Sequence, residues 1–124
     1  MNIKQTLGVI IYAADYEKLA KWYVDTLGFR EVVRLDLPND QIIGFDMGTN
    51  YFSIGKHSEV KDKNKDSCRI MINFNTDSVS KAYKEIKSKG VKIVAAPFLD
   101  PTGIVWCMTI KDPENNIIQF FGDK

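Results

Sequence analysis

The chain has 124 residues, and its 17 basic and 16 acidic side chains leave a net charge of +1 at pH 7. A chain this close to neutral lacks the basic surface that attracts nucleic acid or anionic lipid. It also contains no apolar run near the roughly 20 residues that span a membrane. We therefore expect one small domain, residues 1–124, with neither nucleic acid nor a membrane as a partner.

The two cysteines, Cys68 and Cys107, lie in apolar segments, and the first residues of the chain do not resemble a secretory signal. Disulfides are rare in reducing compartments. We therefore expect both thiols to be reduced and the protein to be cytoplasmic.

In the first half of the chain, one helix follows one strand and precedes three more. The strands are expected at residues 5–13, 29–37, 41–47 and 51–56, and the helix between Asp15 and Leu27. Residues 38–40, Pro-Asn-Asp, favour a turn between the second and third strands. The predicted order is β-α-β-β-β.

The second half repeats this order after a polar stretch, residues 58–66, that is typical of a solvated linker. Its strands are expected at residues 68–74, 91–95, 104–111 and 117–121, and its helix at residues 78–88. A loop is expected from Pro97 through Gly103, because two prolines and a glycine interrupt the pattern there.

The spacing of the helix ends is the clearest sign of a repeat. Asp15 lies thirteen residues before Gly28, and Asp77 lies thirteen before Gly90. The N-cap candidates are Asp15 in the first helix and Asp77 or Ser78 in the second, and each glycine suits a left-handed C-cap. We predict an α+β fold of tandem βαβββ modules, residues 1–57 and 67–124, that form a curved mixed sheet with a ligand cleft.

Two motifs resemble the vicinal oxygen chelate superfamily of glyoxalases, dioxygenases and bleomycin-resistance proteins. The first is Trp22-Tyr23 followed by Leu27-Gly28-Phe29 at the end of the first helix. The second is the turn into the last strand, Asp112-Pro113-Glu114-Asn115-Asn116-Ile117. The resemblance covers nearly the whole chain and implies a glyoxalase-like fold.

Enzymes of this superfamily hold one divalent metal ion, with ligands from the first and last strand of each module. The resemblance places Gly8, Ser53, Met71 and Gln119 at these positions. Glycine has no side chain, a thioether suits soft metals, and neutral hydroxyl and amide oxygens are weak ligands without carboxylate or imidazole. We therefore expect no metal site, no cofactor and no catalytic residue.

The single histidine, His57, lies four residues beyond Ser53 on the same strand face, either as an exposed strand end or as a functional group. Trp22 belongs to the apolar helix stripe and is assigned to the core. Trp106 can face either side of its strand. The remaining carboxylates are scattered rather than paired, which disfavours acid and base catalysis.

The predicted function is metal-free binding, either sequestering or carrying, of an apolar or aromatic small molecule, as the resemblance to bleomycin-resistance proteins implies. Gly8, Ile10 and Phe121 contribute to the predicted cleft, and the predicted ligand-binding residues are Tyr12, Tyr51, Ser53, Arg69, Met71, Asn73, Trp106 and Gln119. The alternative is a divergent metal-dependent lyase or dioxygenase of the glyoxalase type. The resemblance and the apolar sheet face also predict a homodimer.

Overall fold

Each half of the chain folds in the predicted β-α-β-β-β order. The computed structural model describes residues 1–124 and divides into two units, Met1–Asp62 and Lys63–Lys124. Each unit holds one mixed sheet of four strands, ordered β1-β4-β3-β2 in the first and β5-β8-β7-β6 in the second. The prediction of two βαβββ modules with mixed sheets is confirmed.

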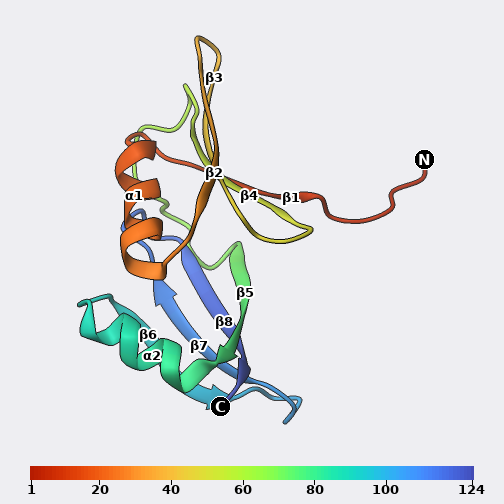
Figure 1. Ribbon diagram of the computed structural model, residues 1–124, viewed down its shortest axis with the longest axis vertical. Helices are drawn as coiled ribbons and strands as arrows, with labels where there is room; N and C mark the ends of the chain where they lie inside the picture. The colour runs from red at the N-terminus through yellow and green to blue at the C-terminus, as the bar shows by residue number, and fades with distance from the viewer. The chain divides into compact units, whose positions relative to one another are not determined.

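The first unit begins with an extended segment, residues 1–7, and continues into β1 and α1 (Figure 1). The helix α1 connects β1 to β2 at the far edge of the sheet, and the antiparallel strands β2, β3 and β4 then lead back to β1. The pair β1–β4 is therefore parallel, and the other pairs are antiparallel. The element bounds are β1 (Gly8–Tyr12), α1 (Tyr16–Leu27), β2 (Glu31–Leu37), β3 (Asp40–Phe45) and β4 (Tyr51–Lys56).

The second unit has the same pairing, with β5 and β8 parallel and the remaining pairs antiparallel. Its bounds are β5 (Met71–Ser78), α2 (Val79–Ser88), β6 (Ile93–Leu99), β7 (Trp106–Lys111) and β8 (Ile117–Asp123). Neither α1 nor α2 is long and apolar enough to cross a membrane.

The helix ends carry the expected caps except at the end of α2, where the C-cap is Lys89 with φ −90° and Gly90, with φ 74°, follows it. Asp15 accepts a hydrogen bond from the Lys18 backbone N–H at 3.1 Å, and Gly28 adopts a left-handed conformation with φ 73°. In the second unit Ser78, rather than Asp77, is the N-cap, because its Oγ accepts from the Lys81 N–H at 3.3 Å.

An aromatic cluster joins α1 to its sheet. The ring of Tyr23, which is fully buried, lies 5.4, 6.4 and 5.6 Å from the rings of Phe29, Phe45 and Phe52. Trp22 contacts Tyr23 edge-on at 5.1 Å but is only half-buried, so its assignment to the core holds for one edge of the ring. The sheet face that carries Phe45 and Phe52 is therefore the face that α1 covers.

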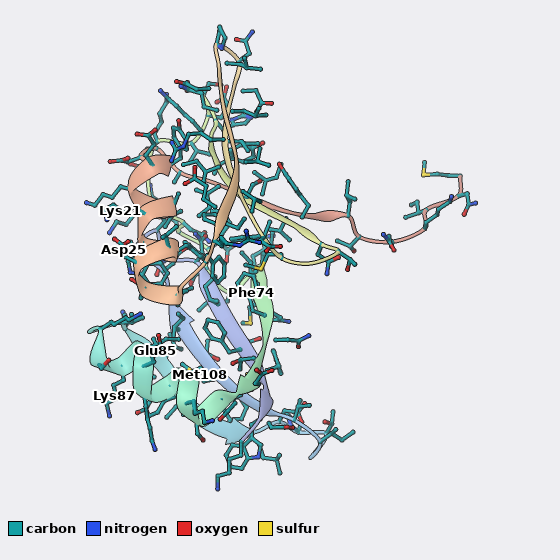
Figure 2. All side chains as sticks on the ribbon, viewed as in Figure 1. Lys21, Asp25, Phe74, Glu85, Lys87 and Met108 are labelled. Atoms are coloured by element: carbon teal, nitrogen blue, oxygen red, sulfur yellow. The ribbon has the colours of Figure 1, made fainter.

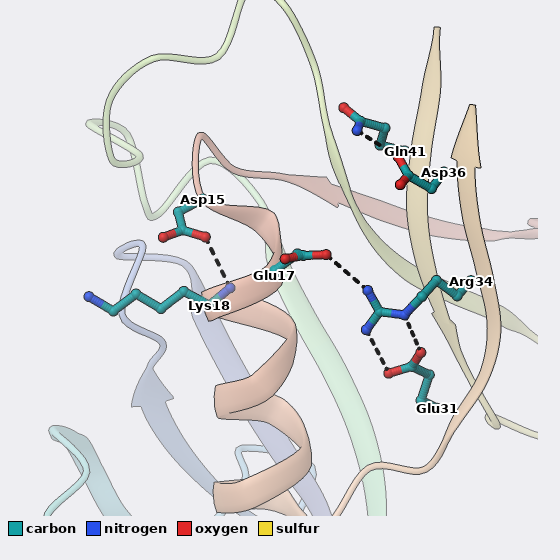
Figure 3. Close-up of polar contacts among 7 residues, drawn as sticks. All are labelled: Asp15, Glu17, Lys18, Glu31, Arg34, Asp36 and Gln41. Carbon is teal, nitrogen blue, oxygen red and sulfur yellow. Dashed lines mark hydrogen bonds and ion pairs between the residues drawn. The ribbon is translucent and has the colours of Figure 1, made fainter. Parts of the chain in front are cut away.

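Polar contacts reinforce this helix-covered face. The guanidinium of Arg34 on β2 donates to both carboxylate oxygens of Glu31 at 2.8 and 3.2 Å and to Glu17 on α1 at 3.0 Å (Figure 3). Its neighbour Asp36 accepts from Gln41 at 2.8 Å. The charged side chains of β2 thus lie on the same face as α1.

The second core is aliphatic with two phenylalanines. Phe74 and Phe120 lie 6.1 Å apart, Met108 is fully buried, and α2 contributes Val79 and Ile86 (Figure 2). Along β5 the apolar Ile72 and Phe74 alternate with Asn73 and Asn75, whereas β8 carries Ile117 and Phe121 on the same face as Gln119, so the second face of this sheet is mixed in polarity.

Most strand boundaries differ from the prediction by a few residues, and the differences in β1, β5 and β6 are the largest. β1 begins at Gly8 rather than residue 5, and β5 begins at Met71 rather than Cys68. Residues 66–69 form a turn, in which the Arg69 N–H donates to the Asp66 carbonyl and the Arg69 guanidinium pairs with the Asp66 carboxylate. The predicted loop at Pro97 is part of β6, an edge strand whose pairing shifts between Ala95 and Phe98 and so tolerates a proline.

The end of the polar linker is not free in solvent. Asn64 donates its N–H to the Glu114 carbonyl and its amide to Asn116 Oδ1, and its carbonyl accepts from Asn115 Nδ2 at 2.7 Å. The buried Asp112 orders this turn, because its Oδ1 accepts from the backbone N–H groups of Glu114 and Asn116, both at 2.9 Å. Residues from 63 onward therefore belong to the second unit.

Candidate functional site

The sheet face of the first unit that lies opposite α1 is apolar and partly exposed. Strand register places Ile10, Ser53, Gly44 and Val33 in one row, and Tyr12, Gly55, Ile42 and Leu35 in the next. We call these two rows, with Tyr51, the open face of unit one. Its large side chains are 37 to 46% exposed except Ile42, which is buried. Asp40, at the hairpin end, is the one charged strand residue on this side.

Ser53 stands out in this surface. Its side chain is completely buried, yet its Oγ has no hydrogen-bond partner. On either side, its register partners are Ile10 and Gly44, neither of which has a polar side-chain atom. Buried hydroxyls are normally satisfied, because an unmade hydrogen bond costs roughly 1–3 kcal/mol.

Gly8 is required by close packing of the backbone. A Cβ at this position would overlap the carbonyl oxygen and Cβ of Tyr51, its partner on β4. No side chain, and therefore no metal ligand, fits at this position without moving β1 or β4.

Tyr12 lies over the glycine of the neighbouring strand. A Cβ on Gly55 would be 3.4 Å from Tyr12 Cε1 and 2.8 Å from Ile42 Cγ1, so the absence of a side chain makes room for both. The Tyr12 ring meets the exposed His57 ring edge-on, with centroids 5.1 Å apart. His57 Nδ1 accepts from the Glu59 N–H at 3.1 Å, which occupies one ring nitrogen in a local turn.

The corresponding face of the second unit is more polar. Asn73, Gln119 and Thr109 share one row, flanked by Met71 and Asn75 on β5. Gln119 Nε2 donates to Thr109 Oγ1 at 3.2 Å. Met71 is 45% exposed, so its side chain is not packed core. Of the predicted site residues in this unit, three therefore share one face: Met71, Asn73 and Gln119.

Two predicted site residues lie elsewhere. Trp106 faces the same side as Met108 and Phe120, opposite to Gln119, and Lys124 Nζ lies 4.8 Å from its ring centroid. Arg69 lies in the turn before β5 and pairs with Asp66. The prediction that Arg69 projects from a strand was wrong, because Arg69 belongs to the turn of residues 66–69 and β5 begins only at Met71.

No three His, Cys, Asp or Glu side chains of residues 1–124 lie close enough together to hold a metal ion. The thiol of Cys107, on the same face as Thr109, is buried, and this burial raises its pKa, although the Thr109 hydroxyl opposes the effect. A thiol that stays protonated is a poor nucleophile and a poor metal ligand.

Sequence reasoning missed the contribution of Val33 and Leu35 on β2, and of Thr109 on β7, to these faces. Val33 and Leu35 alternate with Arg34 and Asp36, a period-two pattern that indicates one apolar and one charged strand face. Thr109 has no such signal, because its partner Gln119 lies on another strand and the register between them is set by packing.

The chain belongs to the Glyoxalase/Bleomycin resistance protein/Dioxygenase superfamily, whose family model matches residues 3–120. None of the curated proteins compared matches the sequence. The superfamily assignment agrees with the fold, the repeat and the turn motif that precedes β8.

Solved structures of this superfamily have the same fold. A member from Sphaerobacter thermophilus DSM 20745 is 22% identical with a TM-score of 0.79, and the match covers 98% of each chain. TnmS3, an antibiotic binding protein from Streptomyces sp. CB03234, is 16% identical with a TM-score of 0.78, over 100% of this chain and 99% of that one.

A lactoylglutathione lyase from Agrobacterium tumefaciens is 17% identical with a TM-score of 0.72, over 98% of this chain and 96% of that one. At these identities the likeness extends to the fold and not to the activity.

Proposed function

We propose that this protein binds an apolar or aromatic small molecule without a metal ion, and that the open face of unit one supplies the main contact surface. The observation that carries the proposal is the exposed apolar surface formed by Ile10, Tyr12 and Tyr51 around Ser53. Aromatic and aliphatic side chains with few polar groups are the usual lining of a small-molecule site.

The residues at the superfamily's metal positions favour binding over metal-dependent chemistry. Gly8 leaves no space for a ligand side chain, and Gln119, whose Nε2 donates to Thr109 Oγ1, offers only one neutral carbonyl oxygen. Ser53 and Met71 offer neither carboxylate nor imidazole. The antibiotic-binding TnmS3 shows that the shared fold supports a binding role in at least one relative.

On its own sheet face the second unit offers Met71, Asn73 and Gln119 as polar and polarisable ligand contacts. We leave Arg69 and Trp106 out of the proposed set, because one pairs with Asp66 and the other faces the side of Met108. The cytoplasmic location and the sequestering or carrier role belong to the same proposal.

Metal content and thermal shift together test this proposal. Purified protein is expected to contain no stoichiometric zinc, nickel, iron or manganese, and EDTA should leave its Tm unchanged. Uncharged aromatic probes such as Nile red should raise the Tm of the EDTA-treated protein. About one metal ion per chain, together with a lower Tm in EDTA, would instead support the metal-dependent lyase or dioxygenase alternative.

We also propose that the chain forms a homodimer. The edge strand β2 exposes Val33, Leu35 and Leu37 at 46, 39 and 55%, and an unpaired apolar edge of this length is a typical protein contact surface. A second copy paired along β2 would add backbone hydrogen bonds at this edge and pack its own side chains beside Val33, Leu35 and Leu37, which leaves the rest of the open face accessible.

A further inference from the structure

We infer that the ligand is uncharged where it meets unit one and that it presents a hydrogen-bond acceptor, such as a carbonyl oxygen, to the Ser53 hydroxyl. This inference rests on the proposed function and narrows it to one chemical class. Two independent features carry it: the unpaired buried hydroxyl, and the lack of charged side chains in the two strand rows around it, since Asp40 lies beyond them at the hairpin end.

The hydroxyl is a polar group without a structural role. Ser53 Oγ caps no helix, joins no strand and bonds no other side chain. Since an unsatisfied buried hydroxyl lowers stability, the fold alone would favour alanine or valine at this position. A polar group that the fold does not use is instead available to an incoming molecule.

The side chains around Ser53 indicate the chemistry of the rest of the ligand. Ile10, Tyr12 and Tyr51 surround the serine row and are 39, 37 and 41% exposed, so a ligand that moves them aside gains apolar contact as it reaches Oγ. The charged groups of β2 lie on the opposite face, where Arg34 is occupied by Glu17 and Glu31. A charged ligand group would therefore lose its hydration here and find no counter-ion.

A carbonyl fits these constraints better than a hydroxyl or an amine. The serine hydroxyl can donate its proton to a carbonyl oxygen, and the carbonyl brings no further N–H or O–H into the apolar surface. The expected ligand is thus a planar or aliphatic apolar body with a ketone, ester, lactone or quinone oxygen at one end.

Four naphthalene probes that differ in one substituent test the inference by calorimetric titration of the full chain. They are 2-acetylnaphthalene, 2-ethylnaphthalene, 2-naphthoate and 2-naphthylmethylammonium. Wild-type protein should bind the acetyl probe roughly 3- to 10-fold more tightly than the ethyl probe, as expected for one hydrogen bond. The two charged probes should bind more weakly than either.

Substitution of Ser53 separates binding from folding. In Ser53→Ala and Ser53→Val the preference for the acetyl probe should disappear, while the Tm stays equal to that of the wild type or rises. Ser80→Ala, which removes a half-buried hydroxyl from α2, should keep the preference. A lower Tm in both Ser53 variants would show that the hydroxyl has a structural partner and would overturn the inference.

The outcomes distinguish the inference from the proposed function. Equal binding of the acetyl and ethyl probes to the wild type, a preference that survives in Ser53→Ala, or tightest binding of a charged probe would overturn the inference and leave apolar binding standing. Failure of all four probes to bind would overturn both.

Discussion

At the scale of single residues, the open face of unit one depends on positions that carry no side chain or a very small one. Gly8 and Gly55 let Tyr51, Tyr12 and Ile42 approach the neighbouring backbone, and Ser53 lies between them. The apolar surface is therefore a product of close strand packing as much as of apolar residue types.

Histidine introduced at the first-strand positions Gly8 and Met71 should destabilise the first unit and leave the stability of the second nearly unchanged. Gly8→His should lower the free energy of unfolding by roughly 1–3 kcal/mol or more, because the new Cβ overlaps Tyr51. Met71→His should change stability by less than about 0.5 kcal/mol, because Met71 is 45% exposed. Urea denaturation of both variants checks the pair, and a stable Gly8→His variant would refute the packing argument.

The two cysteines should differ sharply in reactivity. Cys68 is exposed to a reagent in solution, whereas Cys107 is buried and its burial raises its pKa, so Cys107 is both covered and kept protonated. Titration with a chromogenic disulfide reagent should modify one thiol per native chain and both in guanidinium chloride. Cys68→Ser should then be unreactive until it unfolds, and rapid labelling of that variant in buffer would contradict the structure.

At the scale of elements, the repeated helix ends show how much local chemistry sets the fold. Both helices begin with a side-chain oxygen that accepts from the N–H three residues later, and both are followed by a glycine with positive φ. The same kind of N-cap therefore fixes where each helix begins, and the buried side chains of each helix pack it against its own sheet.

Loss of either cap should destabilise the protein by a similar amount. Asp15→Ala and Ser78→Ala should each cost about 1 kcal/mol of unfolding free energy, because one backbone N–H loses its partner. Lys18→Ala and Lys81→Ala serve as controls, since only the backbone N–H of these residues takes part in the caps. Cap variants that are as stable as these controls would show that the caps contribute nothing measurable.

Elements with local signals could be predicted from the sequence, and those that depend on register could not. The helices and the β2–β3 hairpin follow from caps, periodicity and turn residues. The start of β5 was misplaced because the Arg69–Asp66 pair ends the preceding turn, an interaction between side chains that periodicity does not reveal. The burial of Ser53 also escaped prediction, because it depends on Ile10 and Gly44 from other strands.

At the scale of the whole molecule, the two units share a fold but not the chemistry of their open faces. Unit one presents aromatic and aliphatic side chains, while unit two mixes amides and a threonine with Met71, Ile117, Phe121 and Lys111. Duplication of a βαβββ module thus leaves each copy free to change its surface without changing its strand order.

The proposed homodimer has a direct hydrodynamic test. Light scattering at micromolar concentration should give twice the chain mass of 14.1 kDa. Leu35→Lys should shift the mass to that of one chain, because a charge on the β2 edge would have to be buried in the interface. Ile104→Lys, at an 80% exposed position in a turn, should remain dimeric, and a monomeric wild type would refute the proposal.

Metal-free binding at the open face of unit one can be tested by calorimetric titration of the EDTA-treated protein with 2-acetylnaphthalene. The titration compares one variant on this face with one away from it. Wild type and Val94→Lys, which alters a 48% exposed residue of β6, should bind the probe with the same affinity without added metal. Ile10→Lys should bind at least about 10-fold more weakly at unchanged Tm, because it puts a charge into the open face of unit one. Binding that requires a divalent metal, or that Ile10→Lys leaves intact, would contradict the account.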